Sequence, residues 1–193
     1  HSGGKASFFV PCVLTSETSD AALSRGNVEL ARAFGLPLNW VLGEHNDPRS
    51  LNAAAARAGV PMIAAELGGG GGADPDITAM AEAGLLGCLK HLGILAGTPT
   101  RAEHLRRVRI ASPLQSLYAP ADGLFDRHCQ AGQDATAGQL AGTLQFPFEP
   151  EREPLALGFP TSGFVLAHVN RGMVRRGELL ALVVETLPSD SPD

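Results

Sequence analysis

A single carboxylate at the end of an apolar segment is the strongest chemical signal in this sequence. Residues 61–67 read Pro-Met-Ile-Ala-Ala-Glu-Leu, which has the length of a buried strand, and residues 68–72 are all glycine. An open α/β sheet binds its ligand outside the carboxyl ends of its strands, where glycine lets a substrate approach the backbone closely. We therefore interpret Glu66 as a candidate catalytic residue, with Gly68 and Gly69 beside it as substrate-binding backbone. Composition alone leaves open the alternative of a polar strand end next to a flexible loop.

A second group of candidates lies before this segment. His1 begins a His-Ser-Gly-Gly-Lys stretch, and another apolar segment, residues 8–14, follows it. Because imidazole is a common zinc donor, a histidine in a loop that leads into the same sheet is a candidate metal ligand. Arg49, with Arg57 and His45 near it, is a candidate to bind a substrate carboxylate, although solvated surface charge is the commoner role of such residues.

Short apolar runs alternate with helical patterns over residues 1–107, which is typical of an α/β layer architecture. Strands are predicted at residues 8–14, 38–42 and 61–67. The first helix is expected to begin with Asn27 as its cap and to end at Gly35.

Two Asp-Pro pairs indicate where further helices begin. Asp47-Pro48 precedes a helix over residues 51–58, and Asp74-Pro75 precedes the longest helix. The residues expected to form the buried stripe of that helix are Ile77, Ala81, Leu85, Cys88, Leu92 and Leu95. The polar and basic residues 98–107 are interpreted as a linker.

The pattern changes to short strands and glycine turns over residues 108–193, and it repeats. Segments at 123–125, 132–134 and 138–141 recur about 40 residues later, at 163–165, 172–174 and 177–180. Two copies with one apolar face each are expected to pair into a small all-β barrel-sandwich domain similar to biotinyl and lipoyl domains, followed by a disordered tail from Thr186. The lysines, Lys5 and Lys90, lie outside the repeat, which excludes a covalent carrier function. We expect a structural cap on the α/β part.

Several of these segments, in this order, resemble the succinylglutamate desuccinylase and aspartoacylase family. They are residues 1–4 with 9–12, 61–72, 83–85 with 92–95, and 121–125. The resemblance implies an α/β fold: the C-terminal part of a zinc-carboxypeptidase-like domain over residues 1–107, followed by the β domain. It also implies a zinc hydrolase that cleaves the amide bond of an N-acyl amino acid, with His1 as a zinc ligand and Glu66 as the general base for a zinc-activated water.

The chain departs from the family pattern at the metal. The other two zinc ligands of the family form an H-x-x-E motif upstream of the His-Ser-Gly-Gly stretch, and here His1 is the first residue. None of the other histidines is followed by glutamate at the third position. The other histidines are His45, His91, His104, His128 and His168. We therefore expect the C-terminal part of a longer enzyme, inactive alone and with weak metal binding or none.

Charge, hydrophobic content and cysteine spacing indicate which partners and which cellular compartment to expect. With a net charge of -5, 44% hydrophobic residues and 18% charged residues, we expect a soluble globular protein without a nucleic-acid partner. Glu82, Lys90 and His91 interrupt the most apolar helical segment, which argues against a membrane partner. Three cysteines without CxxC spacing fit a reducing cytoplasm. Assembly into a homo-oligomer is left open.

Two other functions compete with hydrolysis. Gly68, Gly70 and Ala73 match a G-x-G-x-x-A dinucleotide fingerprint, but no parallel strand ending in an acidic residue follows about 20 residues later. The absence of two family ligands also favours a non-catalytic fragment or interaction module. Metal analysis of this chain against a longer natural form separates the hydrolase from the module, and titration with NADH tests the dinucleotide site.

Overall fold

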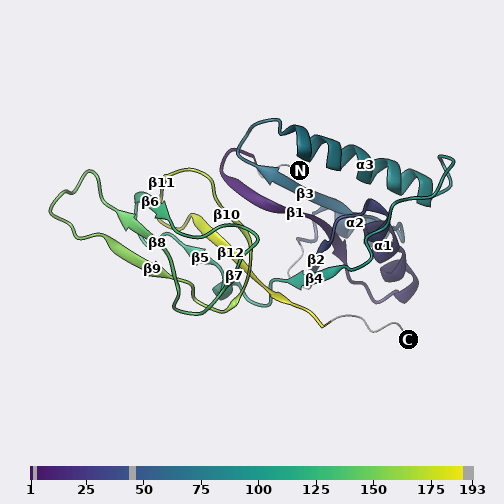
Figure 1. Cartoon of the computed structure of the whole chain (residues 1–193). Helices are drawn as coiled ribbons and strands as arrows, with labels where there is room; N and C mark the ends of the chain where they lie inside the picture. The colour runs from purple at the N-terminus through teal and green to yellow at the C-terminus, as the bar shows by residue number, and fades with distance from the viewer. Residues whose placement is uncertain (2–3, 44–46, 189–193) are drawn as a thin grey trace.

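The computed structural model describes residues 1, 4–43 and 47–188, in an elongated molecule with an α/β part and a β-rich part (Figure 1). The helices of the described residues are α1 (Ala21–Phe34), α2 (Leu51–Arg57) and α3 (Pro75–His91), with a 3₁₀ turn at Pro113–Gln115. The strands are β1 (Ser7–Ser16), β2 (Leu38–Leu42), β3 (Ala64–Gly69), β4 (Arg106–Arg109), β5 (Leu117–Tyr118), β6 (Gly123–Arg127), β7 (Asp134–Ala135), β8 (Leu140–Gln145), β9 (Leu155–Gly158), β10 (Gly163–Val169), β11 (Met173–Val174) and β12 (Leu179–Thr186).

Five strands of the larger sheet close into a mixed barrel. β1 runs parallel to β2, and β2 runs parallel to β4. β4 pairs with the end of β12, β12 pairs with β10, and β10 returns to the first residues of β1. Buried apolar side chains from all five strands pack together, among them Leu14, Leu38 and Val108. β3 lies outside the ring and pairs antiparallel with β1.

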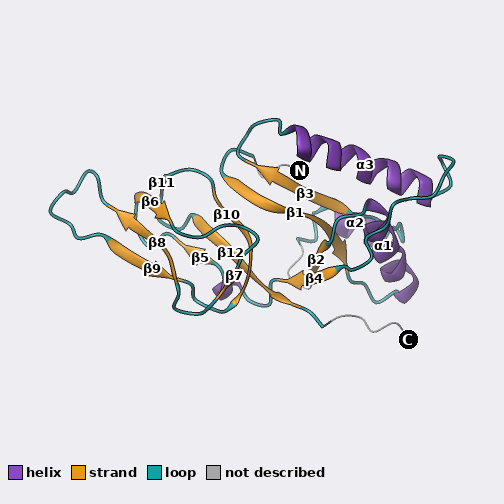
Figure 2. Cartoon of the chain, in the orientation of Figure 1, coloured by secondary structure: helices purple, strands orange, loops and turns teal. Residues whose placement is uncertain are grey.

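The β-rich part contains the predicted repeat. β11, β6, β8 and β9 form a separate antiparallel sheet. Its order corresponds strand for strand to β7, β10, β12 and β5 in the larger sheet, so each of the two sheets of the sandwich contains strands from both copies (Figure 2). Both sheets contribute to one core, which includes Phe125, Leu144 and Val165. The predicted fold class is confirmed: an α/β part is followed by a β barrel-sandwich.

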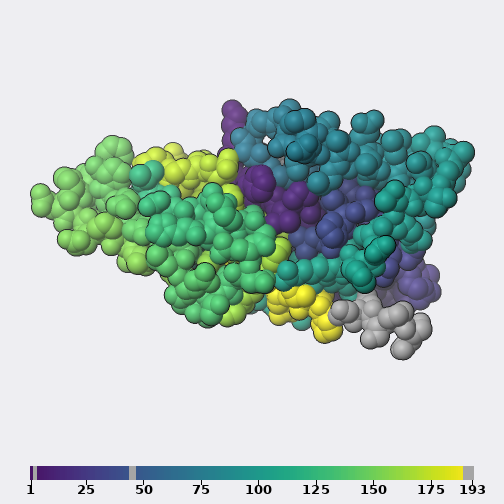
Figure 3. Space-filling view, in the orientation of Figure 1, coloured from purple at the N-terminus to yellow at the C-terminus, as the bar shows by residue number. Residues whose placement is uncertain are grey.

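The predicted boundary at residue 107 falls inside a continuous hydrogen-bonded sheet. Arg106 and Arg107 belong to strand β4, so the prediction that residues 98–107 form a linker is wrong for its last two residues. β10 and β12 join the α/β strands to the sandwich, and the two halves are in contact along this seam (Figure 3). The division into domains at 1–107 and 108–193 stays a prediction. Thr186 ends β12, while residues 189–193 of the predicted tail lie outside the described residues.

Helix α1 begins earlier than expected. Asp20 is its N-cap, because the Asp20 carboxylate accepts hydrogen bonds from the backbone N–H groups of Ala22 and Leu23. Asn27 is therefore an interior residue, and the prediction that it caps the helix is wrong. Its buried amide donates to the Ser16 carbonyl and accepts from the Met62 N–H, which joins α1 to the end of β1 and to the segment before β3.

Of the other two helices, α3 begins at the predicted cap and α2 does not. Ser50, not Asp47, caps α2, and its hydroxyl accepts from the Ala53 N–H. Asp74 caps α3 as expected, with Pro75 in the first turn. The predicted end of α1 at Gly35 is also confirmed, at a left-handed φ of 87°.

The expected buried stripe on α3 is wrong. Leu85 and Leu92 are 58% and 57% exposed, and the buried residues of the helix are Gly84 and Gly87. A Cβ atom on Gly87 would lie 2.2 Å from the Ala33 carbonyl oxygen. Glycine lets α3 pack closely on α1, while Cys88 and Met80, which are partly buried, add to the contact. No described helix has the length and apolarity needed to cross a membrane.

Candidate functional site

His1 and Glu66 come together on strand β3. The amino nitrogen of His1 donates to the Ala65 carbonyl at 2.9 Å, and the Leu67 N–H donates to the His1 carbonyl at 2.8 Å. These two bonds flank Glu66 as in a parallel strand pair. The imidazole Nδ1 of His1 then lies 3.2 Å from Oε1 of Glu66. The two residues that the sequence singled out for chemistry are thus direct neighbours.

The environment of Glu66 is mostly closed. Its side chain is 15% exposed, whereas that of His1 is 82% exposed. Cys12 stands opposite Glu66 in the β1–β3 register and is fully buried, so the two side chains share one face. Burial, with a smaller contribution from the Glu66 charge, raises the pKa of the Cys12 thiol to about 12. Cys12 is therefore neutral near pH 7 and forms an uncharged surface beside the carboxylate.

The glycine loop after Glu66 is held from two sides. Gly68 and Gly70 have left-handed φ angles of 72° and 85°, which glycine adopts without strain. A Cβ on Gly69 would lie 2.0 Å from the Ser7 carbonyl oxygen of β1, and one on Gly70 would lie 3.0 Å from Nδ2 of Asn170, just after β10. Close approach of the chain to itself explains the glycine at position 69. Substrate binding by Gly68 and Gly69 stays a prediction.

Arg49 lies away from this cluster. It follows β2, whose last residue pairs with Ser16 at the end of β1 far from Gly68 and Gly69. Its guanidinium binds the Asp47 carboxylate at 2.7 Å, and both side chains are largely exposed. The structure does not place Arg49 beside Glu66, so a substrate-binding role stays a prediction. His45 lies outside the described residues.

Sequence reasoning did not assign two neighbours of this site. Cys12 belongs to a segment that carried the family resemblance, and the alternation of side chains along a strand could have placed it beside Glu66. Asn170 gave no local signal, because its contact with Gly70 spans 100 positions of the chain and depends on the pairing of β1 with β10.

The donor set in the described residues suits a metal only in part. No group of three or more His, Cys, Asp or Glu side chains in that part of the chain could hold a metal ion. A catalytic zinc site normally has three protein ligands. The exposed imidazole of His1 is chemically suited to supply one of them, and its neighbour Glu66 is a carboxylate. The described residues alone therefore do not form a complete site.

The strand topology does not support the dinucleotide alternative. A dinucleotide fingerprint connects two parallel strands of one βαβ unit. Here β3 runs antiparallel to β1, and the strand that follows α3, β4, pairs with β2 and β12 instead of β3. Gly68, Gly70 and Ala73 thus lack the strand on which the ribose contact depends.

Comparison with known proteins gives consistent matches. Residues 1–92 match the family described as the succinylglutamate desuccinylase/aspartoacylase catalytic domain. An N-alpha-acetyl-L-2,4-diaminobutyric acid deacetylase from Halomonas elongata is 26% identical over 191 residues, which cover 98% of this chain and 56% of the relative.

Solved structures share the fold over nearly the whole chain. The product-bound ectoine utilization protein EutE (DoeB) from Ruegeria pomeroyi has a TM-score of 0.88 at 26% identity, covering 96% of this chain and 56% of that one. A succinylglutamate desuccinylase/aspartoacylase from Rhodobacter sphaeroides has a TM-score of 0.87 at 27% identity, with coverages of 97% and 57%. This chain thus spans a little more than half the length of these relatives.

Proposed function

Since the chain belongs to the succinylglutamate desuccinylase/aspartoacylase family, we propose that it contributes the general base and one zinc ligand to an N-acyl amino acid deacylase. Glu66 is the proposed base and His1 the proposed ligand. The observation that supports this most directly is the 3.2 Å approach of His1 Nδ1 to Glu66 Oε1, fixed by backbone hydrogen bonds on both sides of Glu66.

The two side chains have complementary exposures for these roles. His1 is at the open surface, where its imidazole can meet a metal ion and ligands from the rest of a longer protein. Glu66 is more enclosed, because its strand lies between β1 and the His1 backbone. A zinc ion would polarise the amide carbonyl and activate a water molecule for attack.

Glu66 is proposed to move the proton. Its carboxylate oxygen accepts a proton as the amide is attacked, and the same oxygen returns it to the departing amine. The neutral thiol of Cys12 does not compete as a base or a nucleophile, since its pKa of about 12 keeps it protonated. This division leaves the Glu66 carboxylate as the proposed proton acceptor beside the imidazole of His1.

The proposed substrate class follows from the relatives. The Halomonas elongata relative is named for deacetylation of an N-acetylated diamino acid. We propose an N-acyl amino acid for this protein, without assigning the acyl group or the amino acid. Because the chain spans about half of its relatives, activity is proposed for a full-length protein that contains it.

The test uses two substitutions in that full-length protein. Glu66→Gln keeps the size of the side chain but removes the proton acceptor, so kcat is expected to fall roughly 10²–10⁴-fold with little change in zinc content. His1→Ala is expected to lose most of the zinc, measured by inductively coupled plasma analysis. Glu82→Gln, at an exposed glutamate of α3, is the matched control and should keep both.

The outcomes separate the roles. Near-normal turnover in Glu66→Gln would remove Glu66 from the chemistry, and loss of zinc in that variant would make it a ligand. Stoichiometric zinc in His1→Ala would contradict the assignment of His1.

A further inference from the structure

A cavity of about 710 Å³ lies between helix α1 and the end of strand β1. We name it the α1–β4 pocket, after its two arginine-bearing elements; its defining residues are Ser16 of β1, Arg25 and Arg32 of α1, and Arg107 of β4. Ser16 is the last residue of β1, whereas Glu66 pairs with Cys12 further back on the same strand. The pocket therefore belongs to a different part of the sheet from the His1 and Glu66 pair.

Positive charge is in excess around this pocket. Arg107, with a side chain only 15% exposed, binds Glu17 at 2.6 Å. Arg32 lies 4.0 Å from Glu29, and Arg101 binds the other oxygen of the same carboxylate. Both pocket carboxylates are thus already engaged by arginines.

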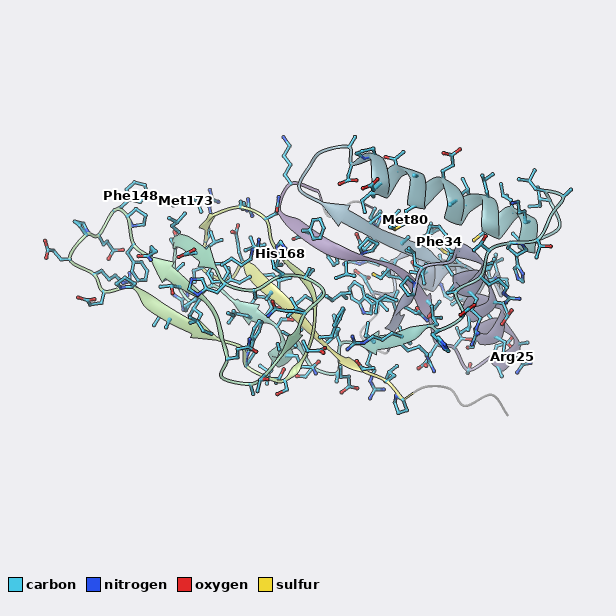
Figure 4. All side chains as sticks on the ribbon, in the orientation of Figure 1. Arg25, Phe34, Met80, Phe148, His168 and Met173 are labelled. Carbon is cyan, nitrogen blue, oxygen red and sulfur yellow. The ribbon has the colours of Figure 1, made fainter. Side chains whose placement is uncertain are left out.

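Arg25 is the cation that remains. Among the described residues it forms no ion pair and no side-chain hydrogen bond, and it is exposed on α1 at the edge of the α/β part (Figure 4). An exposed arginine is common on any surface. Its position on the wall of a cavity that already contains two other guanidinium groups is what gives it a specific role.

The floor of the pocket has unused hydrogen-bonding capacity. The hydroxyl of Ser16 is buried, with the residue 8% exposed, and has no hydrogen-bond partner in the described part of the chain. On the neighbouring strand β2, Nδ2 of the fully buried Asn39 is also unpaired, while Oδ1 of Asn39 accepts from Thr15. Buried polar groups are normally paired, so the unpaired hydroxyl of a residue that lines this cavity is available to a ligand once the Ser16 side chain rotates toward the cavity.

We propose that the α1–β4 pocket binds a compact oxyanion, a phosphate or carboxylate group carried by a small molecule. Arg25 and Arg107 would hold the oxyanion through charge-assisted hydrogen bonds, to which the planar guanidinium fork is suited. The hydroxyl of Ser16, which is buried in the structure, would donate to the oxyanion after rotation of its side chain. Glu17 now binds Arg107. When the ligand binds, the exposed Glu17 side chain would turn into solvent, and the oxyanion would replace its carboxylate on Arg107. A volume of about 710 Å³ accommodates the remainder of a small molecule.

The proposal does not depend on deacylase activity, so binding is measured directly. Inorganic phosphate and succinate are titrated separately into the protein by calorimetry at constant ionic strength. Saturable binding of at least one is expected. Arg25→Ala should weaken it by about tenfold, the effect of one charge-assisted contact. Ser16→Ala, which removes only the hydroxyl, should weaken it severalfold.

Arg175→Ala is the matched control, because Arg175 is an exposed arginine on the β-sandwich, remote in sequence from this pocket. It should bind as the unaltered protein does, and circular dichroism should show all variants folded. Selective binding of phosphate or of succinate identifies the group recognised. Absence of saturable binding up to about 10 mM, or equal weakening by Arg25→Ala and Arg175→Ala, overturns the proposal.

Discussion

Replacing Gly69 by alanine tests the physical reason for the glycine next to the candidate base. The new Cβ would lie 2.0 Å from the Ser7 carbonyl oxygen and 2.9 Å from the Phe8 Cα atom. Non-bonded heavy atoms prefer separations of about 3.5–4.0 Å, so β1 and β3 would have to move apart by more than about 1 Å. That movement disturbs the register in which Phe8 pairs with Gly69 and Phe9 with Gly68.

The change in the free energy of unfolding combines two destabilising contributions and one stabilising contribution. Overpacking costs about 1–3 kcal/mol, and each strand hydrogen bond lost costs about 0.5–1.5 kcal/mol. Alanine restricts the unfolded chain and returns about 0.4–1 kcal/mol. We expect Gly69→Ala to lower the free energy of unfolding by about 2–3 kcal/mol, measured by urea denaturation and circular dichroism.

Gly72→Ala is the control for this experiment. A Cβ on Gly72 meets no heavy atom within 4 Å, so its effect should stay within about 0.5 kcal/mol. A comparably small effect of Gly69→Ala would refute the argument from close packing. The glycine would then be explained by the predicted contact with substrate rather than by contact with β1.

Two further predictions concern buried titratable groups. Burial lowers the pKa of His168 below its ordinary 6.5, so the unfolded chain takes up the proton first and stability should fall as pH drops below about 6.5. Unfolding free energies measured between about pH 8 and pH 5 should show this slope, and His168→Gln should reduce it; an unchanged slope would contradict the assignment. With a pKa of about 12, Cys12 should resist iodoacetamide in the native protein at neutral pH and react in denaturant, as read by mass spectrometry. Equal labelling in both states would show that the thiol is accessible.

The sequence predicted the elements whose signals are local. The alternation of apolar runs and helices gave the α/β part, and the glycine spacing of the second half gave the repeat that forms the two facing sheets. Asp74 and Gly35 act as caps because capping depends on one residue and its immediate neighbours. The family resemblance assigned His1 and Glu66 to the same zinc site, and the structure brings the two side chains within 3.2 Å of each other.

Other features depend on packing between distant segments and gave no local signal. The α3 stripe was chosen for its large apolar residues, but the closest approach to α1 is at Gly84 and Gly87, where a Cβ atom would clash with α1. Asparagine is a common N-cap residue, yet the Asn27 side chain lies inside α1 and joins this helix to Ser16 of β1 and to Met62 before β3. The closure of the barrel pairs β10 with β1 across more than 150 positions and β12 with β4 across more than 70, which periodicity cannot reveal.

Strand β1 carries the mechanical connection between the sandwich and the candidate base. β3, which bears Glu66, pairs with β1 and with no other strand of the described residues. The first residues of β1 pair in turn with β10, where Phe8 stacks on His168 with a ring separation of 5.5 Å. Because β10 belongs to the core of the sandwich, the position of Glu66 is fixed by contacts that extend into the repeat. The β-rich part therefore does more than cap the α/β part: its second copy supplies the strand against which the start of β1, and with it the glycine loop, is aligned.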